Sequence, residues 1–432
     1  MSESNLPDDS EPMVQRIDEA HPEHAPTSPP ATPSVTLPKR DEPPLGMRRA
    51  ADDGTELIDA MAGRASLFGF GFQPHLDAIM AATEQYLGDA ASVSAVDHRI
   101  DENLTDNAQS DDVLFTALMS TFGSSDALNL TSACLTPSAD LAIEKAVELA
   151  RTSEPSSRYR TIALVGSDHG RTGVCRTASG RPELHENYGP MMAGFCHVVA
   201  EDIDSMRQNI DDQTAAVLVS PIDLHDAARP LSAKYLAAVR ELCDEYDLYL
   251  IIDESRLCVG SASTPFVFSS ISDIAADAVI VAAGLFAGLP AGILMTGDRM
   301  VANAITDTSQ YPMLRDVAVE TLSAVNRQGT FAATGKIMSD FAVQVAECIG
   351  HYEFVRDIHA TGMTLGIQTD VQSSELVRAA ARHGLRIEPA GDTSIRLQPP
   401  LVMTDTDQDD LLKRLGATMD VVRRDFADLV VS

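Results

Sequence analysis

The alternation of short apolar runs with amphipathic segments between about residues 130 and 297 constrains the fold most strongly. Five aliphatic or β-branched runs predict strands, at residues 161–166, 214–220, 248–253, 277–283 and 291–297. Residues 233–247 carry apolar side chains at spacings of three and four, which predicts a helix. Alternating strands and helices indicate an α/β fold, with a mostly parallel sheet covered on both faces. Ligands of such sheets bind beyond the carboxyl ends of the strands.

The stretch from Ala278 to Met295 carries no charge and has the length of a marginal membrane span. Three glycines and a proline interrupt it between residues 284 and 292. A buried strand, a turn and a second buried strand explain it better, because strands covered on both faces are continuously apolar. We therefore expect no membrane partner.

The chain is expected to divide into four parts. Residues 1–43 are rich in Pro, Ser, Asp and Glu and poor in large apolar side chains, which predicts a disordered acidic tail. Residues 44–115 are expected to form an N-terminal segment, residues 116–325 a large α/β domain, and residues 326–432 a small α+β domain.

The charge and the cysteines exclude several classes of protein. The formal net charge of −32 argues against nucleic acid and anionic lipid as partners, because their phosphates would be repelled. The six cysteines are scattered without CxxC spacing, so we expect reduced thiols in a cytoplasmic protein and no bound metal. The start of the chain, MSESNLPDD, lacks the apolar core of a signal peptide.

Four segments carry a resemblance to a known family. They are SDHGRTG (167–173), similar to "SFHGRTxG"; RELCDEYDLYLIIDE (240–254), similar to "RELCDEHGALLIFDE"; VAAGLFAGLPAGILM (281–295), similar to "LAKGLGGGLPLGAVL"; and HGLRIEPAGDTSIRLQPPLVMT (383–404), similar to "HGLLVLPAGGNVIRLLPPLVIT". These motifs belong to the class III aminotransferases, which use pyridoxal phosphate (PLP), and most closely to the acetylornithine and ornithine type. The resemblance runs from about residue 44 to the end. It implies PLP-transferase fold type I, with a seven-stranded type of sheet, and a homodimer whose site forms at the subunit interface.

The resemblance implies that Asp253, at the end of LYLIID, pairs with the pyridine nitrogen of PLP. Ala283 stands where the family has the lysine that forms the Schiff base and then moves the proton during transamination. Alanine can do neither. The chain has five lysines, and none is an obvious substitute: Lys39, Lys145, Lys234, Lys336 and Lys413.

The cofactor phosphate is expected at the start of the helix predicted within residues 136–151, because free N–H groups and the helix dipole favour an anion there. Thr136 is expected to cap this helix, with Pro137 at its first position. Ser138 matches the family's "NSGAEANEAALKLAR", whereas Ala139 replaces a glycine and Asp140 adds a negative charge. These changes predict weakened phosphate binding, and a helix N-terminus that binds no ligand is the alternative.

The resemblance also assigns positions around the cofactor ring. Asp168 stands where the family stacks Phe or Tyr on the ring, and Asp223 lies near the glutamine of "EPVQGEGG" that contacts the 3′ oxygen. His169 and Arg171 match the family motif, and both can also be structural. Thr308 matches the threonine that reaches the phosphate of a neighbouring subunit.

Arg396, in SIRLQPPL, matches the arginine that clamps the substrate α-carboxylate through two hydrogen bonds. The alternative is an arginine paired with a local acid. In either case the positions that match the family place Arg396 and Asp253 near one crevice with Ala283.

Three functions remain open. The first is a non-catalytic homologue that keeps the fold and binds a small molecule or a partner, since the losses gather at the site positions. The second is an active transaminase of the acetylornithine type, which needs a substitute amine. The third is a lysine-free enzyme that uses pyridoxamine phosphate, with His169 or His225 as the base.

Overall fold

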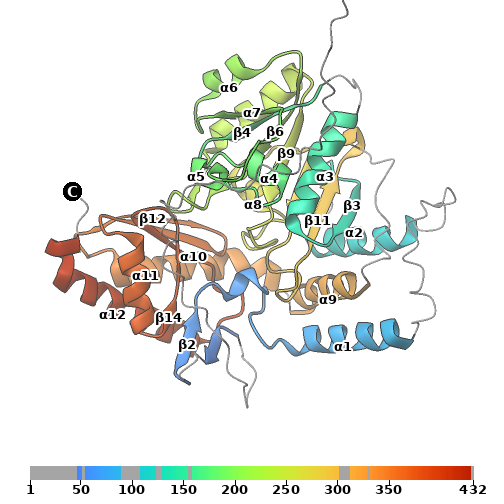
Figure 1. The fold of residues 1–432 in the computed structure, drawn as a ribbon. Helices are drawn as coiled ribbons and strands as arrows, with labels where there is room; N and C mark the ends of the chain where they lie inside the picture. Colours follow the sequence, from blue (N-terminus) through green and yellow to red (C-terminus); the bar gives the residue numbers. More distant parts are fainter. Residues whose placement is uncertain are drawn as a thin grey trace, which may run out of the picture.

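A computed structural model describes residues 46–50, 54–88, 108–122, 129–153, 158–300, 312–328 and 330–429. A large α/β part and a smaller C-terminal part with its own sheet lie side by side (Figure 1). The predicted tail, residues 1–43, and Thr308 lie outside the described residues.

Seven strands form the main sheet, in the order β3-β11-β10-β9-β6-β4-β5. Their bounds are β3 (Ser132–Thr136), β4 (Arg160–Leu164), β5 (Phe195–Val198), β6 (Thr214–Val219), β9 (Tyr249–Glu254), β10 (Ala278–Val281) and β11 (Gly292–Thr296). Strand β11 is antiparallel to both β3 and β10, whereas the other neighbouring pairs are parallel. The predicted α/β fold with a mostly parallel sheet is therefore confirmed.

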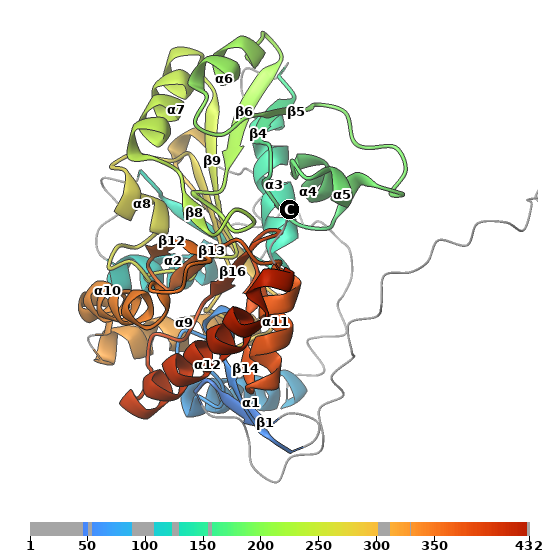
Figure 2. The same cartoon turned by 90° about the vertical axis from the view of Figure 1, so that its left-hand side faces the viewer.

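Helices cover both faces of this sheet. Successive strand residues point to opposite faces, and both faces carry apolar side chains that need covering. The covering helices are α2 (Ala108–Phe122), α3 (Ala139–Thr152), α4 (Gly173–Ala178) and α7 (Ala233–Glu245). On one face Leu218 and Ile251 belong to a core shared with α3 and α4. On the other face Val219 and Ile252 pack with α2 and α7. Figure 2 shows α3 and α7 on opposite sides of β6 and β9.

The C-terminal part contains a four-stranded antiparallel sheet in the order β12-β13-β16-β15. Its elements are α10 (Thr330–Ile349), β12 (Val355–Thr361), β13 (Thr364–Thr369), α11 (Ser373–Arg382), β14 (Leu385–Arg386), β15 (Glu388–Pro389), β16 (Ser394–Leu397) and α12 (Asp405–Leu429). Apolar residues of α10, α11 and α12 meet those of β13 and β16 in one core.

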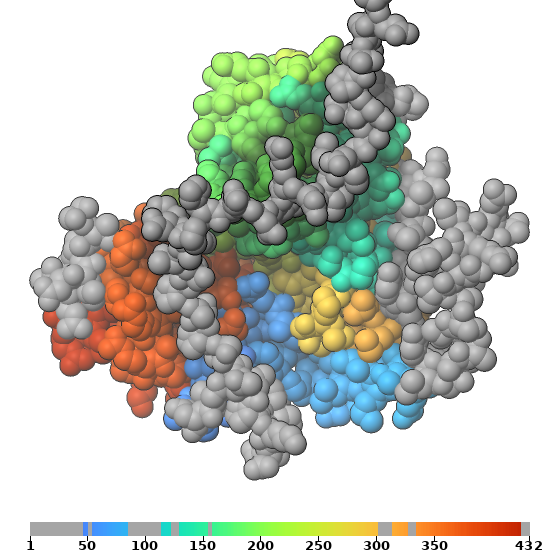
Figure 3. Space-filling model, in the orientation of Figure 1, coloured from blue at the N-terminus to red at the C-terminus, as the bar shows by residue number. Residues whose placement is uncertain are grey.

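The N-terminal strands join this C-terminal part. Strand β2 (Glu56–Asp59) pairs with β1 (Arg48–Ala50) and, in parallel, with β14. In the space-filling view the blue N-terminal residues lie between the orange C-terminal part and the yellow residues of the large part (Figure 3). Strand pairing therefore brings Asp59 and Arg386, which are far apart in sequence, into direct contact.

The remaining elements connect these parts. They are η1 (Ala62–Arg64), α1 (Gln73–Gly88), α5 (Pro182–His185), α6 (Ile203–Asn209), β7 (Ile222–Asp223), β8 (Arg229–Pro230), α8 (Val267–Ile271), η3 (Asp298–Met300) and α9 (Pro312–Gln328). The long helices α1 and α9 run side by side beneath the large part (Figure 1).

Two expectations from the sequence have clear outcomes. The uncharged stretch forms the antiparallel strands β10 and β11, and none of the described helices has the length and apolar character needed to cross a bilayer. The predicted cap at Thr136 is wrong: Thr136 ends β3, and its hydroxyl donates to the carbonyls of Ser138 and Gly292. Ser138 caps α3 instead, and the helix begins at Ala139.

Gly292 sets how closely β11 approaches the start of α3. A Cβ at this position would lie 2.7 Å from Cα of Ala139, so Gly292→Ala must push the helix away. We expect a loss of about 1–3 kcal/mol in the free energy of unfolding, as for other overpacked sites. Denaturant unfolding measures it. Gly173→Ala is the matched control, because its Cβ would meet only the Tyr188 hydroxyl at 3.6 Å; equal effects of the two substitutions would contradict the prediction.

Candidate functional site

Asp253 lies near the end of β9, where the carboxyl ends of the parallel strands meet. It is buried, and its Oδ2 is 2.7 Å from Nδ1 of His169. Its Oδ1 accepts the backbone N–H of Ser255 at 2.9 Å. Burial raises the pKa of Asp253, but the contact with His169 outweighs it, and the pKa lies below the usual value. The carboxylate therefore stays ionised and is held on both oxygens by the chain itself.

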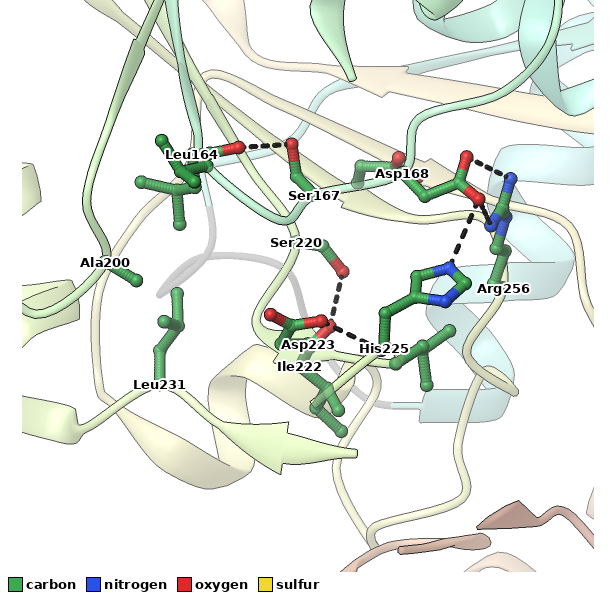
Figure 4. A pocket seen from close by; sticks show the side chains of 13 residues that line it. Leu164, Ser167, Asp168, Ala200, Ser220, Ile222, Asp223, His225, Leu231 and Arg256 are labelled. Atoms are coloured by element: carbon green, nitrogen blue, oxygen red, sulfur yellow. Dashed lines mark hydrogen bonds and ion pairs between the residues drawn. The ribbon is translucent and has the colours of Figure 1, made fainter. Parts of the chain in front are cut away.

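Asp168 lies in the loop after β4 and is the centre of a larger ionic cluster. Arg171 donates to its Oδ1 at 2.6 Å, and Arg256 contacts its two oxygens at 2.8 and 2.7 Å. Nε2 of His225 lies 3.2 Å from Oδ2. Figure 4 shows Asp168, His225 and Arg256 pointing toward one another. The acid at this position thus receives three cationic or hydrogen-bonding side chains instead of stacking on a ring.

This cluster fixes the charges of its members. Burial raises the pKa of Asp168, but hydrogen bonds from His225, Arg171 and Arg256 bring it far below the usual value. Burial lowers the pKa of Arg256, but Asp168 more than compensates, and the pKa is raised. Both groups are therefore ionised at neutral pH, as a buried pair with several hydrogen bonds requires.

The space beside this cluster is small. Asp168, Asp223, His225 and Asp253 line a cavity of about 30 Å³. Such a volume holds a water molecule or two rather than an aromatic ring. Burial also raises the pKa of Asp223, whose Oδ1 accepts the backbone N–H of His225 at 2.8 Å.

Groups of the chain itself occupy the start of α3. Oγ of Ser138 accepts the N–H of Leu141 at 3.1 Å. Oδ2 of Asp140 accepts the N–H groups of Arg171 and Thr172 at 2.6 and 3.0 Å. The carboxylate of Asp140 therefore ties the loop after β4 to the helix, and it places a negative charge where the sequence analysis expected a phosphate.

Ala283 lies two residues beyond β10, and its N–H donates to the carbonyl of Ser255 at 3.1 Å. Together with Ser138 and Ala139 it lines a second cavity, of about 490 Å³. The structure describes four lysines, none of which lines this cavity: Lys145, Lys234, Lys336 and Lys413. Lys145 pairs with Glu148 and Lys336 with Asp340, each on its own helix.

Arg396 is buried on β16 and belongs to neither cavity's lining. Its Nη1 donates to the carbonyl of Leu224 at 2.9 Å, and its Nη2 to Glu388 at 2.9 Å. Its Nε is buried without a hydrogen-bond partner among the described residues. The structure thus places Arg396 on a local acid, which is the alternative that the sequence left open.

The sequence analysis missed the charged wall of the larger cavity, which consists of Arg49, Arg64, Arg256, Arg386 and Glu388. A signal was available: in HGLRIEPAG, Arg386 and Glu388 stand where the family motif "HGLLVLPAG" has leucines. Of the residues named from the sequence, the structure brings together Asp168, His169, Asp223 and Asp253, and separately Ser138, Ala139 and Ala283.

Comparison with known proteins identifies the family to which the sequence is similar. Residues 44–419 match the family model "Aminotransferase class-III". The acetylornithine aminotransferase of Agrobacterium fabrum is 33% identical over 64% of this chain and 71% of its own length. The acetylornithine aminotransferase of Caldanaerobacter subterraneus is 28% identical over 65% of this chain and 73% of its own length.

A solved structure shows the same fold. The ornithine aminotransferase of Toxoplasma gondii superposes with a TM-score of 0.73 at 19% identity, covering 89% of this chain and 90% of that one. The fold is therefore that of the PLP-dependent aminotransferases, as the resemblance implied. The chain belongs to the class III aminotransferase family.

Removing the acid at the centre of the ionic cluster tests how far the site depends on it. Asp168→Asn leaves the partly buried charge of Arg256 without its acid, so we expect a loss of at most about 3–5 kcal/mol in the free energy of unfolding, the cost for a fully buried pair. Because the pKa of Asp168 is depressed in the folded chain, its stabilisation is present above the unfolded pKa of about 3.9 and is lost as the pH falls below it. The variant should therefore lose stability less steeply than the wild type below about pH 4.

Denaturant unfolding at several pH values measures both effects. Asp226→Asn is the control, because Asp226 forms an exposed ion pair with Arg229, a type worth less than about 1 kcal/mol. The double variant Asp168→Asn/Arg256→Gln should recover part of the loss, since it removes the stranded charge. A single variant as stable as the control would show that the cluster does not hold the site together.

Proposed function

We propose that this chain is a class III aminotransferase homologue, acetylornithine aminotransferase-like, that does not catalyse transamination and instead binds a small molecule. One observation carries the proposal: Ala283 lines the larger cavity, and none of the four described lysines does. Transamination in this family requires a primary amine that forms a Schiff base and then moves a proton. A methyl group supplies neither function.

The described residues also do not fit PLP. The ring would need the space beside Asp253, where Asp168 and Arg256 form a partly buried ion pair and the free volume is about 30 Å³. The phosphate would need the start of α3, where Ser138 and Asp140 already bind the chain's own N–H groups. These contacts oppose both the stacking and the anion binding on which the cofactor depends.

Two further properties belong to the same proposal. We propose a homodimer, by analogy with the interface site that the family implies, and a cytoplasmic location, because the six cysteines are scattered and four of them are buried. Sedimentation of the purified chain measures its oligomeric state.

A direct test uses the purified full-length chain with added PLP. We expect no covalent adduct after borohydride reduction, as read by the mass of the intact chain, since no described amine faces the cavity. We also expect no glutamate from N-acetylornithine and 2-oxoglutarate above a heat-treated control. The Agrobacterium fabrum relative, treated in parallel, is the positive control.

Each alternative has its own result in this experiment. A reducible adduct on any lysine, together with glutamate formation, would establish an active transaminase and end the proposal. Pyridoxamine phosphate retained by the native protein would support the lysine-free enzyme instead, because that reading alone requires the amine form of the cofactor. Absence of both leaves the non-catalytic homologue.

A further inference from the structure

The larger cavity has an unusually basic wall for a chain with a formal net charge of −32. Its lining includes Arg49, Arg64, Arg256 and Arg386, together with Glu388. Arg49, Arg64 and Arg386 are partly open, with 20, 36 and 40% of their side chains exposed. A ligand in the cavity can therefore reach them.

The arginines here outnumber the acids that the structure gives them. Asp59 lies 2.8 Å from Arg386 and 3.5 Å from Arg49. Glu388 lies 2.7 Å from Arg64, 2.9 Å from Arg396 and 3.1 Å from Arg386. Four guanidinium groups thus share two carboxylates, which leaves 4 − 2 = 2 positive charges in this described network.

Proton loss cannot remove this excess. A guanidinium keeps its proton in proteins, and Glu388 is ionised, since Arg64, Arg396 and Arg386 lower its pKa against the effect of burial. Burial lowers the pKa of Arg396, and the nearby charges of Arg64 and Arg256 lower it further. Nε of Arg396 is also buried without a hydrogen-bond partner among the described residues, and Nε of Arg49 is buried 3.5 Å from the carboxylate of Asp59. An anion with two negative charges would balance the network.

The rest of the cavity indicates what kind of anion fits. Its lining also includes Phe70, Phe286, Leu289 and Pro290, which offer apolar contacts to a carbon skeleton. The volume of about 490 Å³ lies within the usual range for small-molecule sites. An organic ligand therefore suits the cavity better than a bare inorganic ion.

We propose that this cavity binds a small organic dianion, with Arg64 and Arg386 as the residues that hold its charge. The inference rests on the proposed function, because it requires the cavity to be free of a covalently held cofactor. Arg386 and Glu388 stand where the family motif has leucines, so these charges belong to this chain and not to the family's substrate site. A dicarboxylate and a phosphate monoester share the required chemistry.

Calorimetry on the purified full-length chain, without added PLP, tests the proposal with three probes. Succinate and glycerol 3-phosphate are the dicarboxylate and the phosphate monoester, and succinamide is the uncharged match for succinate. We expect at least one dianion to bind and to bind more weakly as salt is added, because salt screens the arginines. Succinamide should not bind. Failure of both dianions, or equal binding of succinamide, would overturn the proposal.

Two substitutions in the cavity wall should change the affinity for the dianion in opposite directions. Arg64→Gln removes one half-exposed cation and should weaken binding about tenfold, the usual scale for a charge-assisted hydrogen bond. Glu388→Gln removes the competing negative charge and should tighten binding several-fold. Arg378→Gln is the matched control, because Arg378 is an exposed arginine paired with Glu375 of its own helix and lies outside the lining of the cavity, and it should leave the affinity unchanged.

Circular dichroism and thermal unfolding establish whether each variant is folded. If Glu388→Gln does not fold, the affinity of Arg64→Gln alone tests the assignment. Equal affinities of Arg64→Gln and Arg378→Gln, or weaker binding by a folded Glu388→Gln, would overturn the assignment. A lysine adduct with PLP would contradict the proposed function but not this inference alone. The two failures are distinguishable, because the anion titration is made without cofactor.

Discussion

The buried carboxylate of Asp168 is the interaction on which the site depends. It receives Arg171 from its own loop, His225 from the loop after β6 and Arg256 from the loop after β9. One side chain therefore joins three loops at the carboxyl ends of three parallel strands. Because a buried charge without its partner costs several kcal/mol, these loops can separate only by exposing the pair to water.

The same pairing separates the site into two regions of different character. Arg256 lines both cavities and forms the boundary between them. On the side of Asp253 the charged groups are mostly acidic and the free volume is small. On the side of Ala283 the wall is basic and the volume is large. The overall acidity of the chain thus says little about its interior, since charge is balanced pair by pair over a few ångströms.

Much of the fold follows from the sequence because it depends on local periodicity. Runs such as 248–253 and 277–283 form β9 and β10 within a residue or two, and Asp253 lies at a strand end as expected. The cap of α3 was missed because the hydroxyl of Thr136 has a second acceptor on β11, which lies 156 residues away. The arginines of the basic wall come from segments far apart in sequence, so only the departure of Arg386 and Glu388 from the leucines of the family motif could have indicated it.

The nature of the side chains limits what the larger cavity can do. Alanine has no titratable group, and a guanidinium has donors but no acceptor and does not give up its proton near neutral pH. Ala283, Arg64 and Arg386 therefore supply neither a nucleophile nor a general base, and Glu388, the carboxylate of the same wall, is paired with arginines. The guanidinium groups present a fixed, forked arrangement of N–H donors that matches carboxylate or phosphate oxygens. Such a wall can hold and orient an anion.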